Sequence, residues 1–111
     1  MPTPTPPPLI ADVSVNPQAN VFFDGRCISH TLIAADGARK SVGVILPPAS
    51  LTFNVGAPEV METVAGTCEI RLPGDADWRT IGVGDRFSVE ANTAFEIRVA
   101  DAPYHYVCHF G

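Results

Sequence analysis

The chain has 111 residues, of which 46% are hydrophobic and 17% are charged, so it has enough apolar residues for one folded core and too few residues for two. Seven Lys and Arg against 12 Asp and Glu give a net charge of -5, and the basic residues form no long run. Because clustered basic residues carry most nucleic-acid affinity, we predict no nucleic-acid partner.

The first 17 residues are set apart by proline. Five of the 11 prolines fall in the first eight residues, where no strand ladder forms because proline has no N–H. We therefore expect residues 1–17 to be a Pro-rich flexible tail and residues 18–111 to form the folded domain. No basic segment followed by an apolar run begins the chain, so we expect no leader and no membrane contact, and a cytoplasmic location.

From residue 21 onward, Gly and Pro recur about every ten residues, a spacing typical of short strands joined by turns. Apolar and polar residues alternate between these breakers, most strictly in 67–72, 86–89 and 95–99. Further strands are predicted at 27–34, 41–46, 51–55, 60–65, 78–83 and 104–110, with a hairpin turn at Asp36-Gly37. The pattern predicts an all-β single domain, either a sandwich or a jelly-roll barrel.

The three cysteines, Cys27, Cys68 and Cys108, are widely separated and form no CxxC pair, which argues against a zinc or dithiol site. Cys68 and Cys108 alternate with apolar residues. We therefore expect buried free thiols that pack as small hydrophobic side chains.

Residues 60–89 resemble the two-motif core of the cupins, whose first motif ends in Glu, six residues and Gly, as Glu59 and Gly66 do here. The resemblance implies a cupin-like antiparallel β-barrel of the jelly-roll type. The three positions where metal-holding cupins carry His are occupied by Phe53 and Val55, or with the alternative spacing Thr52 and Asn54, and by Phe95. One remaining carboxylate does not hold a transition-metal ion against water, so we predict no metal and no cofactor.

A more specific resemblance runs along residues 18–110. It is carried, in order, by 21–26 (VFFDGR), 39–44 (RKSVGV), Thr52-Phe53, 58–61 (PEVM), 64–66 (VAG), Leu72-Pro73, Trp78, 87–89 (FSV) and 106–108 (YVC). Together these segments resemble the small pyrimidine/purine nucleoside phosphorylase family, formerly a domain of unknown function. The resemblance implies a homodimer that cleaves purine and pyrimidine nucleosides with inorganic phosphate as co-substrate, giving the free base and (deoxy)ribose 1-phosphate. Family members commonly have Lys where this chain has Arg26 and a basic residue where it has His109, so the preferred nucleoside stays open.

Phosphorolysis needs a positioned phosphate, stabilisation of a positively charged sugar, and help for the departing base. For the phosphate we expect Arg39, whose planar guanidinium pairs with oxyanions, together with Ser41, two residues on and therefore on the same strand face. Arg26, beside a glycine turn, is a second candidate. The alternative for Arg39 is a residue that caps an exposed hairpin.

For the sugar we expect Glu59, which would face the positive anomeric carbon or bind the ribose hydroxyls; the alternative is a turn carboxylate after Pro58. Phe53, Tyr104 and Tyr106 are candidate stacking platforms for the base, with a purely core role as the alternative. The leaving base takes its proton from His30, Tyr106 or water, and the sequence does not choose among them.

Two other functions remain open at this point. One is a non-catalytic sugar- or nucleotide-binding cupin, whose ligand would raise the melting temperature without turnover. The other is a metal-dependent cupin enzyme with atypical ligands, which would purify with stoichiometric metal. Phosphate-dependent base release that a chelator leaves unchanged distinguishes the phosphorylase from both.

Overall fold

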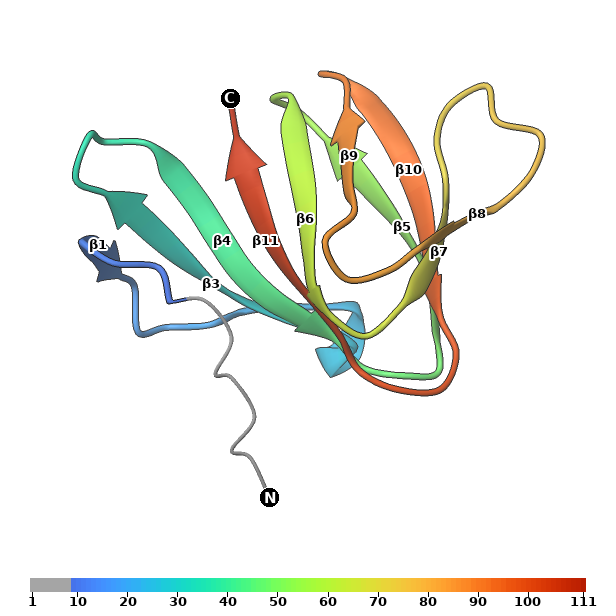
Figure 1. Cartoon of the computed structure of the whole chain (residues 1–111), viewed down its shortest axis with the longest axis horizontal. Coiled ribbons are helices and arrows are strands. Elements are labelled where there is room, and N and C mark those ends of the chain that lie inside the picture. The colour runs from blue at the N-terminus through green and yellow to red at the C-terminus, as the bar shows by residue number, and fades with distance from the viewer. Residues whose placement is uncertain (1–8) are drawn as a thin grey trace.

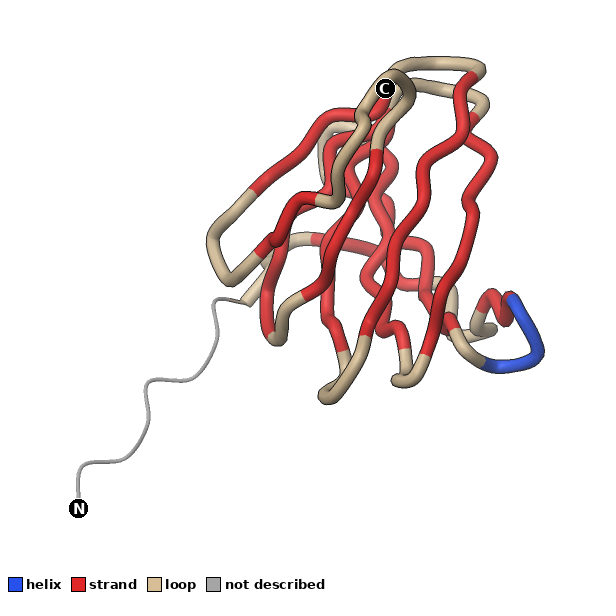
Figure 2. Tube along the Cα trace, turned by 90° about the vertical axis from the view of Figure 1, so that its right-hand side faces the viewer, coloured by secondary structure: helices blue, strands red, loops and turns tan. Residues whose placement is uncertain are grey.

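The structure is a computed structural model in which residues 9–111 are described, and it is built almost entirely of strands. The strands are β1 (Val13–Val15), β2 (Asn20–Phe22), β3 (Cys27–Ala34), β4 (Arg39–Ile45), β5 (Ala49–Val55), β6 (Glu59–Ala65), β7 (Cys68–Arg71), β8 (Arg79–Ile81), β9 (Arg86–Val89), β10 (Thr93–Val99) and β11 (Tyr104–Phe110). One short 3-10 helix, η1 (Phe23–Gly25), follows β2 and lies at the periphery of the strands (Figure 2). The predicted all-β domain is confirmed.

The strands form two antiparallel sheets that face each other (Figure 1). The large sheet has the order β1-β3-β4-β11-β6-β9, with β2 also paired to β3, and the small sheet has the order β5-β10-β7-β8. Within residues 9–111 neither sheet closes on itself, so the closed jelly-roll barrel is not confirmed. The structure keeps the two-layer arrangement, in which alternate side chains of both sheets fill the space between them.

The core lies between the sheets and follows the predicted alternation. The largest fully buried side chains are Tyr104, Ile45, Ile70, Ile97 and Cys27, which come from both sheets. All three cysteines are free and buried, as the sequence predicts. Burial raises the pKa of each thiol, that of Cys68 to about 11, so the thiols stay protonated at neutral pH.

Two of the predicted turns are visible in the backbone. The β3–β4 hairpin turns at Asp36-Gly37, where the Asp36 carboxylate accepts the Ala38 N–H at 2.9 Å. Gly66, the glycine of the cupin-like motif, joins β6 to β7 with a φ of +81°, and a β-carbon there would collide with the carbonyl of Pro103. Only glycine fits that position without strain.

The N-terminal part of the chain differs from the prediction. β1 lies inside the segment predicted as a flexible tail and pairs with β3, Val13 opposite Ala34. β2 follows and pairs with the other end of β3. The Pro-rich stretch 1–8 lies outside the described residues. No helix of the described chain has the length and apolar character to cross a membrane.

Candidate active site

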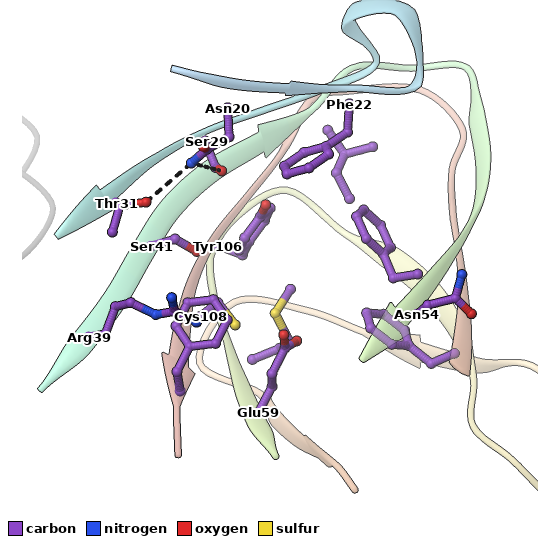
Figure 3. A pocket seen from close by; sticks show the side chains of 15 residues that line it. Asn20, Phe22, Ser29, Thr31, Arg39, Ser41, Asn54, Glu59, Tyr106 and Cys108 are labelled. Atoms are coloured by element: carbon purple, nitrogen blue, oxygen red, sulfur yellow. Dashed lines mark hydrogen bonds between the residues drawn. The ribbon is translucent and has the colours of Figure 1, made fainter. Parts of the chain in front are cut away.

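A cavity of about 330 Å³ opens between the inner face of the large sheet and the aromatic residues of β5 and β10 (Figure 3). Its lining comes from seven strands: Asn20, Phe22, Ser29, Thr31, Arg39, Ser41, Ile45, Phe53, Asn54, Glu59, Met61, Phe95, Tyr106, Cys108 and Phe110. Its size is at the lower end of the range of small-molecule sites. Five of the seven residues predicted for the site, Arg39, Ser41, Phe53, Glu59 and Tyr106, are among the lining residues.

The strand register brings these residues together. Period-two alternation puts Arg39, Ser41 and Gly43 of β4 on the inner face, and the ladders align them with inward residues of β3, β11 and β6. The inner face is therefore ordered in rows: Ser29–Gly43–Tyr106–Thr63, then Thr31–Ser41–Cys108–Met61, and at the open edge Ile33–Arg39 beside Phe110–Glu59.

Glu59 is the acidic residue of the cavity lining, and it is half-buried. Burial raises the pKa of its carboxyl, and the neighbouring Cys108 thiol and the Arg39 charge partly offset that rise. Figure 3 shows Arg39 and Glu59 on either side of Cys108. The site therefore holds a carboxylate and a guanidinium that face one cavity without forming an ion pair within 4.0 Å.

Arg39 is the Lys or Arg residue among those that line the cavity. Four other arginines are neutralised by carboxylates: Arg71 by Glu96, Arg79 by Asp75, Arg86 by Glu62 and Arg98 by Glu69. The Arg39 guanidinium instead lies over the Phe110 ring, 4.5 Å from its centroid. A cation held against an aromatic face keeps its N–H groups at the ring edge free for an oxyanion.

Ser41 and Cys108 form the floor between those two charges. Both are buried, and they are directly opposite each other in the β4–β11 ladder. Burial and the neighbouring Glu59 charge raise the pKa of the Cys108 thiol, in that order. Cys108 is therefore a protonated, neutral thiol. It lacks the lowered pKa that a nucleophilic cysteine needs.

Tyr106 presents its ring to the cavity because the residue beside it is glycine. Gly43 is directly opposite Tyr106 across the β4–β11 ladder, and a β-carbon on Gly43 would lie 2.5 Å from the Tyr106 hydroxyl oxygen. The hydroxyl lies 3.4 Å from the Cys27 sulfur, and burial raises the pKa of the phenol. Tyr106 is therefore a fixed, protonated phenol at neutral pH.

Aromatic rings form the opposite wall. Phe53 of β5 and Phe95 of β10 are stacked at 5.5 Å with an interplanar angle of 18°, and Phe23 meets Phe53 edge-on at 5.1 Å. Phe22, 46% exposed, closes the cavity on the β2 side. Flat apolar faces of this kind suit a planar heteroaromatic group.

Two of the predicted residues are not brought to the cavity. Tyr104 is two residues from Tyr106 on the same strand face, but it is fully buried and its hydroxyl is bonded to Thr63 Oγ1 at 2.8 Å. Arg26 follows η1 and donates to the carbonyl of Pro47 at 3.4 Å. Neither side chain lines the site: Tyr104 lies at the fully buried end of β11, and Arg26 lies before β3 and is bonded to Pro47.

Several lining residues were missed by the sequence reasoning. Ser29 and Thr31 alternate with Cys27 in a predicted strand, so the alternation contained a signal for their shared face. Asn20 carried none, since its place depends on the β2–β3 pairing. Asn20 Nδ2 donates to Ser29 Oγ at 3.4 Å and to Thr31 Oγ1 at 3.2 Å, which makes these three residues one polar cluster.

The donor groups of the cavity do not suit a transition metal. The positions at which cupins carry imidazoles hold Phe53 and Phe95, which pack against each other. Of the histidines, His30 bonds to the Asn16 carbonyl oxygen and His109 to Glu62, and neither lines the cavity. Within residues 9–111 no group of three or more His, Cys, Asp or Glu side chains has metal-binding geometry.

The same two-sheet architecture occurs in solved structures. A protein of unknown function from Acinetobacter sp. ADP1, assigned to the domain DUF1255, superimposes with a TM-score of 0.88 at 38% identity, over 93% of this chain and 98% of that one. A protein of unknown function from Vibrio parahaemolyticus gives a TM-score of 0.77 at 38% identity, over 86% and 97%. The fold thus defines a class of small two-sheet β-proteins.

Sequence comparison then gives the family. The family model described as pyrimidine/purine nucleoside phosphorylase matches residues 17–110. A protein of that name from Thiobacillus denitrificans is 62% identical over 100 residues, which are 90% of this chain and 95% of that protein. Another, from Aromatoleum aromaticum, is 61% identical over 99 residues, which are 89% of this chain and 92% of that protein. The chain belongs to the pyrimidine/purine nucleoside phosphorylase family, which confirms the resemblance read from its segments.

Proposed function

We propose that this protein is a nucleoside phosphorylase that cleaves purine and pyrimidine nucleosides with inorganic phosphate, releasing the free base and (deoxy)ribose 1-phosphate. Family membership supports the reaction. The observation that carries the proposal to this site is a single cavity with an unpaired guanidinium, a half-buried carboxylate and an aromatic wall. These are the three groups that phosphate, a cationic sugar and a base require.

In this proposal Arg39 and Ser41 hold the phosphate. The guanidinium binds two anion oxygens, and the hydroxyl two residues on lies on the same inner face. Phosphate is already a nucleophile, so the protein needs only to place an oxygen beside C1′, on the face opposite the base.

Glu59 stabilises the sugar as the bond from C1′ to the base breaks. That step builds positive charge on the ring oxygen and C1′, and a carboxylate fixed beside it favours the transition state over the neutral ground state. The Cys108 thiol and Arg39 keep the ionised form of Glu59 accessible against its burial. The reaction needs no covalent enzyme intermediate and no metal or other cofactor, with phosphate as the co-substrate.

The base stacks on the aromatic wall of Phe22 and Phe53. Stacking accepts every base because each has a flat face, which agrees with broad specificity. Tyr106 is a protonated phenol in the cavity lining, whereas His30 does not line the cavity, so Tyr106 or water supplies the proton to the leaving base. Arg26 and Tyr104 have no part in this arrangement.

We also propose that the enzyme is a cytoplasmic homodimer and that its two sheets are an open relative of the cupin barrel. The edges of the sheets, among them β9 and β5, offer strands that a second copy can pair with or cover. Three free thiols suit a reducing compartment. Light scattering after size-exclusion chromatography tests the dimer, and a monomeric mass at micromolar concentration would refute it.

The decisive experiment is base release from uridine and inosine by purified protein, with and without phosphate. We expect release that depends on phosphate and is unchanged by a chelator. Glu59→Gln is expected to abolish most of the activity, with Glu62→Gln, on the outer face of β6, as its matched control. Ligand-induced stabilisation without turnover would favour a binding protein, and loss of activity with the chelator would favour a metal enzyme.

A further inference from the structure

The polar cluster of Asn20, Ser29 and Thr31 has no role in the reaction as described so far. It lines the cavity at the β2–β3 side, beside Ser41, and belongs to no ion pair. Ser29 is buried and Thr31 is half-buried, so their hydroxyls meet a ligand in the cavity rather than bulk water. Resting on the phosphorylase function proposed above, we propose that this cluster extends the anion site, so that phosphate is held by Arg39, Ser41, Thr31 and Ser29, with Asn20 as the positioning residue.

The hydrogen-bond directions support an anion. Asn20 Nδ2 has two hydrogens and donates one each to Ser29 Oγ and Thr31 Oγ1, at 3.4 and 3.2 Å. Both hydroxyl oxygens already accept a bond, so each hydroxyl hydrogen is free to be donated to another group. Phosphate oxygens are acceptors, and two directed donors match them.

The strand register places these donors next to the predicted phosphate residues. Thr31 is directly opposite Ser41 in the β3–β4 ladder, and Ser29 is opposite Gly43. Directly opposed residues in an antiparallel pair have β-carbons about 4.5 to 5.5 Å apart, so one tetrahedral anion spans Thr31 and Ser41. The space left by Gly43, which has no side chain, is taken by the Tyr106 ring, so the anion lies on the Thr31–Ser41 side of this face.

The charges of the cavity are divided in the same way. The side formed by β2, β3 and β4 presents Arg39, hydroxyls and an amide, with no carboxylate among its lining residues. The acid, Glu59, lies across β11 on β6. An anion is favoured beside Arg39 and the hydroxyls, and a developing cation is favoured beside Glu59. The pentose hydroxyls therefore lie nearer to Glu59 than to the Asn20 cluster.

The test separates phosphate binding from turnover. Inorganic phosphate is titrated by calorimetry into nucleoside-free protein at constant ionic strength, and KM values for phosphate and uridine are measured in parallel. Asn20→Asp keeps the shape of the side chain, but its carboxylate accepts the hydroxyl hydrogens of Ser29 and Thr31 and adds a negative charge. Thr31→Val removes the Thr31 hydroxyl, whereas Thr31→Ser keeps it. Thr52→Val, an exposed strand threonine outside the cavity, is the matched control.

We expect the phosphate Kd to rise about ten- to hundredfold in Asn20→Asp and Thr31→Val, the range expected for a lost hydrogen bond to a charged group. Thr31→Ser and Thr52→Val stay within about twofold of the parent protein, as does the uridine KM of every variant. Melting curves of all variants show whether each is folded before its binding is compared.

An unchanged phosphate Kd in both Asn20→Asp and Thr31→Val would overturn the inference. If the uridine KM or the preference for ribose over deoxyribose shifts in those variants while the phosphate Kd does not, the cluster binds the pentose instead. A wild-type protein that binds no phosphate would overturn it as well. Weakened phosphate binding in a protein that releases no base would support the anion subsite and refute the phosphorylase function instead.

Discussion

Gly43→Ala tests the arrangement of Tyr106 against the large sheet. The new β-carbon would lie 2.5 Å from the Tyr106 hydroxyl oxygen, 2.6 Å from Cζ and 3.0 Å from Cε1, all far inside normal contact. Tyr106 is 7% exposed and stacks on Tyr104 at 6.1 Å, so the ring has little room to retreat within the core. It can move only toward the cavity.

The expected loss of stability follows from this clash. Overpacking of a core position costs about 1 to 3 kcal/mol. For a domain of this size each kcal/mol lowers the melting temperature by roughly 4 to 8 °C, so we expect a decrease of about 4 to 24 °C by circular dichroism. The displaced ring also narrows the cavity, so the KM for nucleoside rises.

Two comparisons make this prediction specific. Gly56→Ala is the control, because a β-carbon there meets nothing within 4 Å, and its melting temperature should equal or slightly exceed that of the parent. In a Tyr106→Ala background Gly43→Ala should cost little, since its collision partner is gone. Full additivity of Gly43→Ala with Tyr106→Ala would show that the clash with the ring is not the cause.

Three further predictions concern charge and metal. Arg39→Lys keeps the charge but loses the planar guanidinium, so the KM for phosphate should rise about tenfold, and it should rise more in Arg39→Ala. Arg98→Ala is the control and should leave this KM unchanged, because Arg98 pairs with Glu69 outside the cavity. Equal effects of the two alanine variants would contradict the site. Burial raises the pKa of Glu59, so the acid-side fall in activity should occur at a pH above the ordinary Glu pKa of about 4.3. Arg39→Ala should move this fall to higher pH, because it removes a charge that lowers the pKa of Glu59. A shift of the acid-side fall to lower pH would refute the coupling. Dialysis against a chelator should leave kcat for uridine unchanged, and activity restored only by added metal would contradict the mechanism.

The stability of the folded protein should depend on Glu62 in a predictable direction. The hydrogen bond from His109 holds the pKa of Glu62 below its ordinary value, with Arg86 adding to the effect. A lowered folded-state pKa gives stability that is present above the unfolded pKa and lost as the pH falls through the folded one. Urea titrations between about pH 3 and 6 should therefore show a shallower acid decline for Glu62→Gln than for the parent; identical slopes would refute this linkage.

Sequence alternation predicted the strands well where it was long and regular. Residues 27–34, 86–89 and 104–110 coincide with β3, β9 and β11, because one buried and one solvated face impose a period of two. β1 and β2 were not predicted because each has three residues, too few for a period to show. They owe their form to pairing with β3, which only the folded chain supplies.

The same limit applies to the site. Period two put Arg39 and Ser41 on one face, and the motif spacing singled out Glu59, so these three were within reach of the sequence. Periodicity assigns a face but no depth along the strand, which is why Tyr106 lines the cavity and Tyr104 does not. Asn20 depends on the register of a strand pair and was beyond local pattern.

The three buried thiols give the chain a built-in reporter of its own unfolding. Alkylating reagents attack the thiolate, and each of these sulfurs is both shielded and held protonated in the native state. Labelling therefore waits for the sheets to separate, and Cys27, Cys108 and Cys68 sample both sheets. Mass spectrometry of partly labelled protein can thus tell whether the two layers open in one event or in turn, and whether bound phosphate delays the layer that holds it.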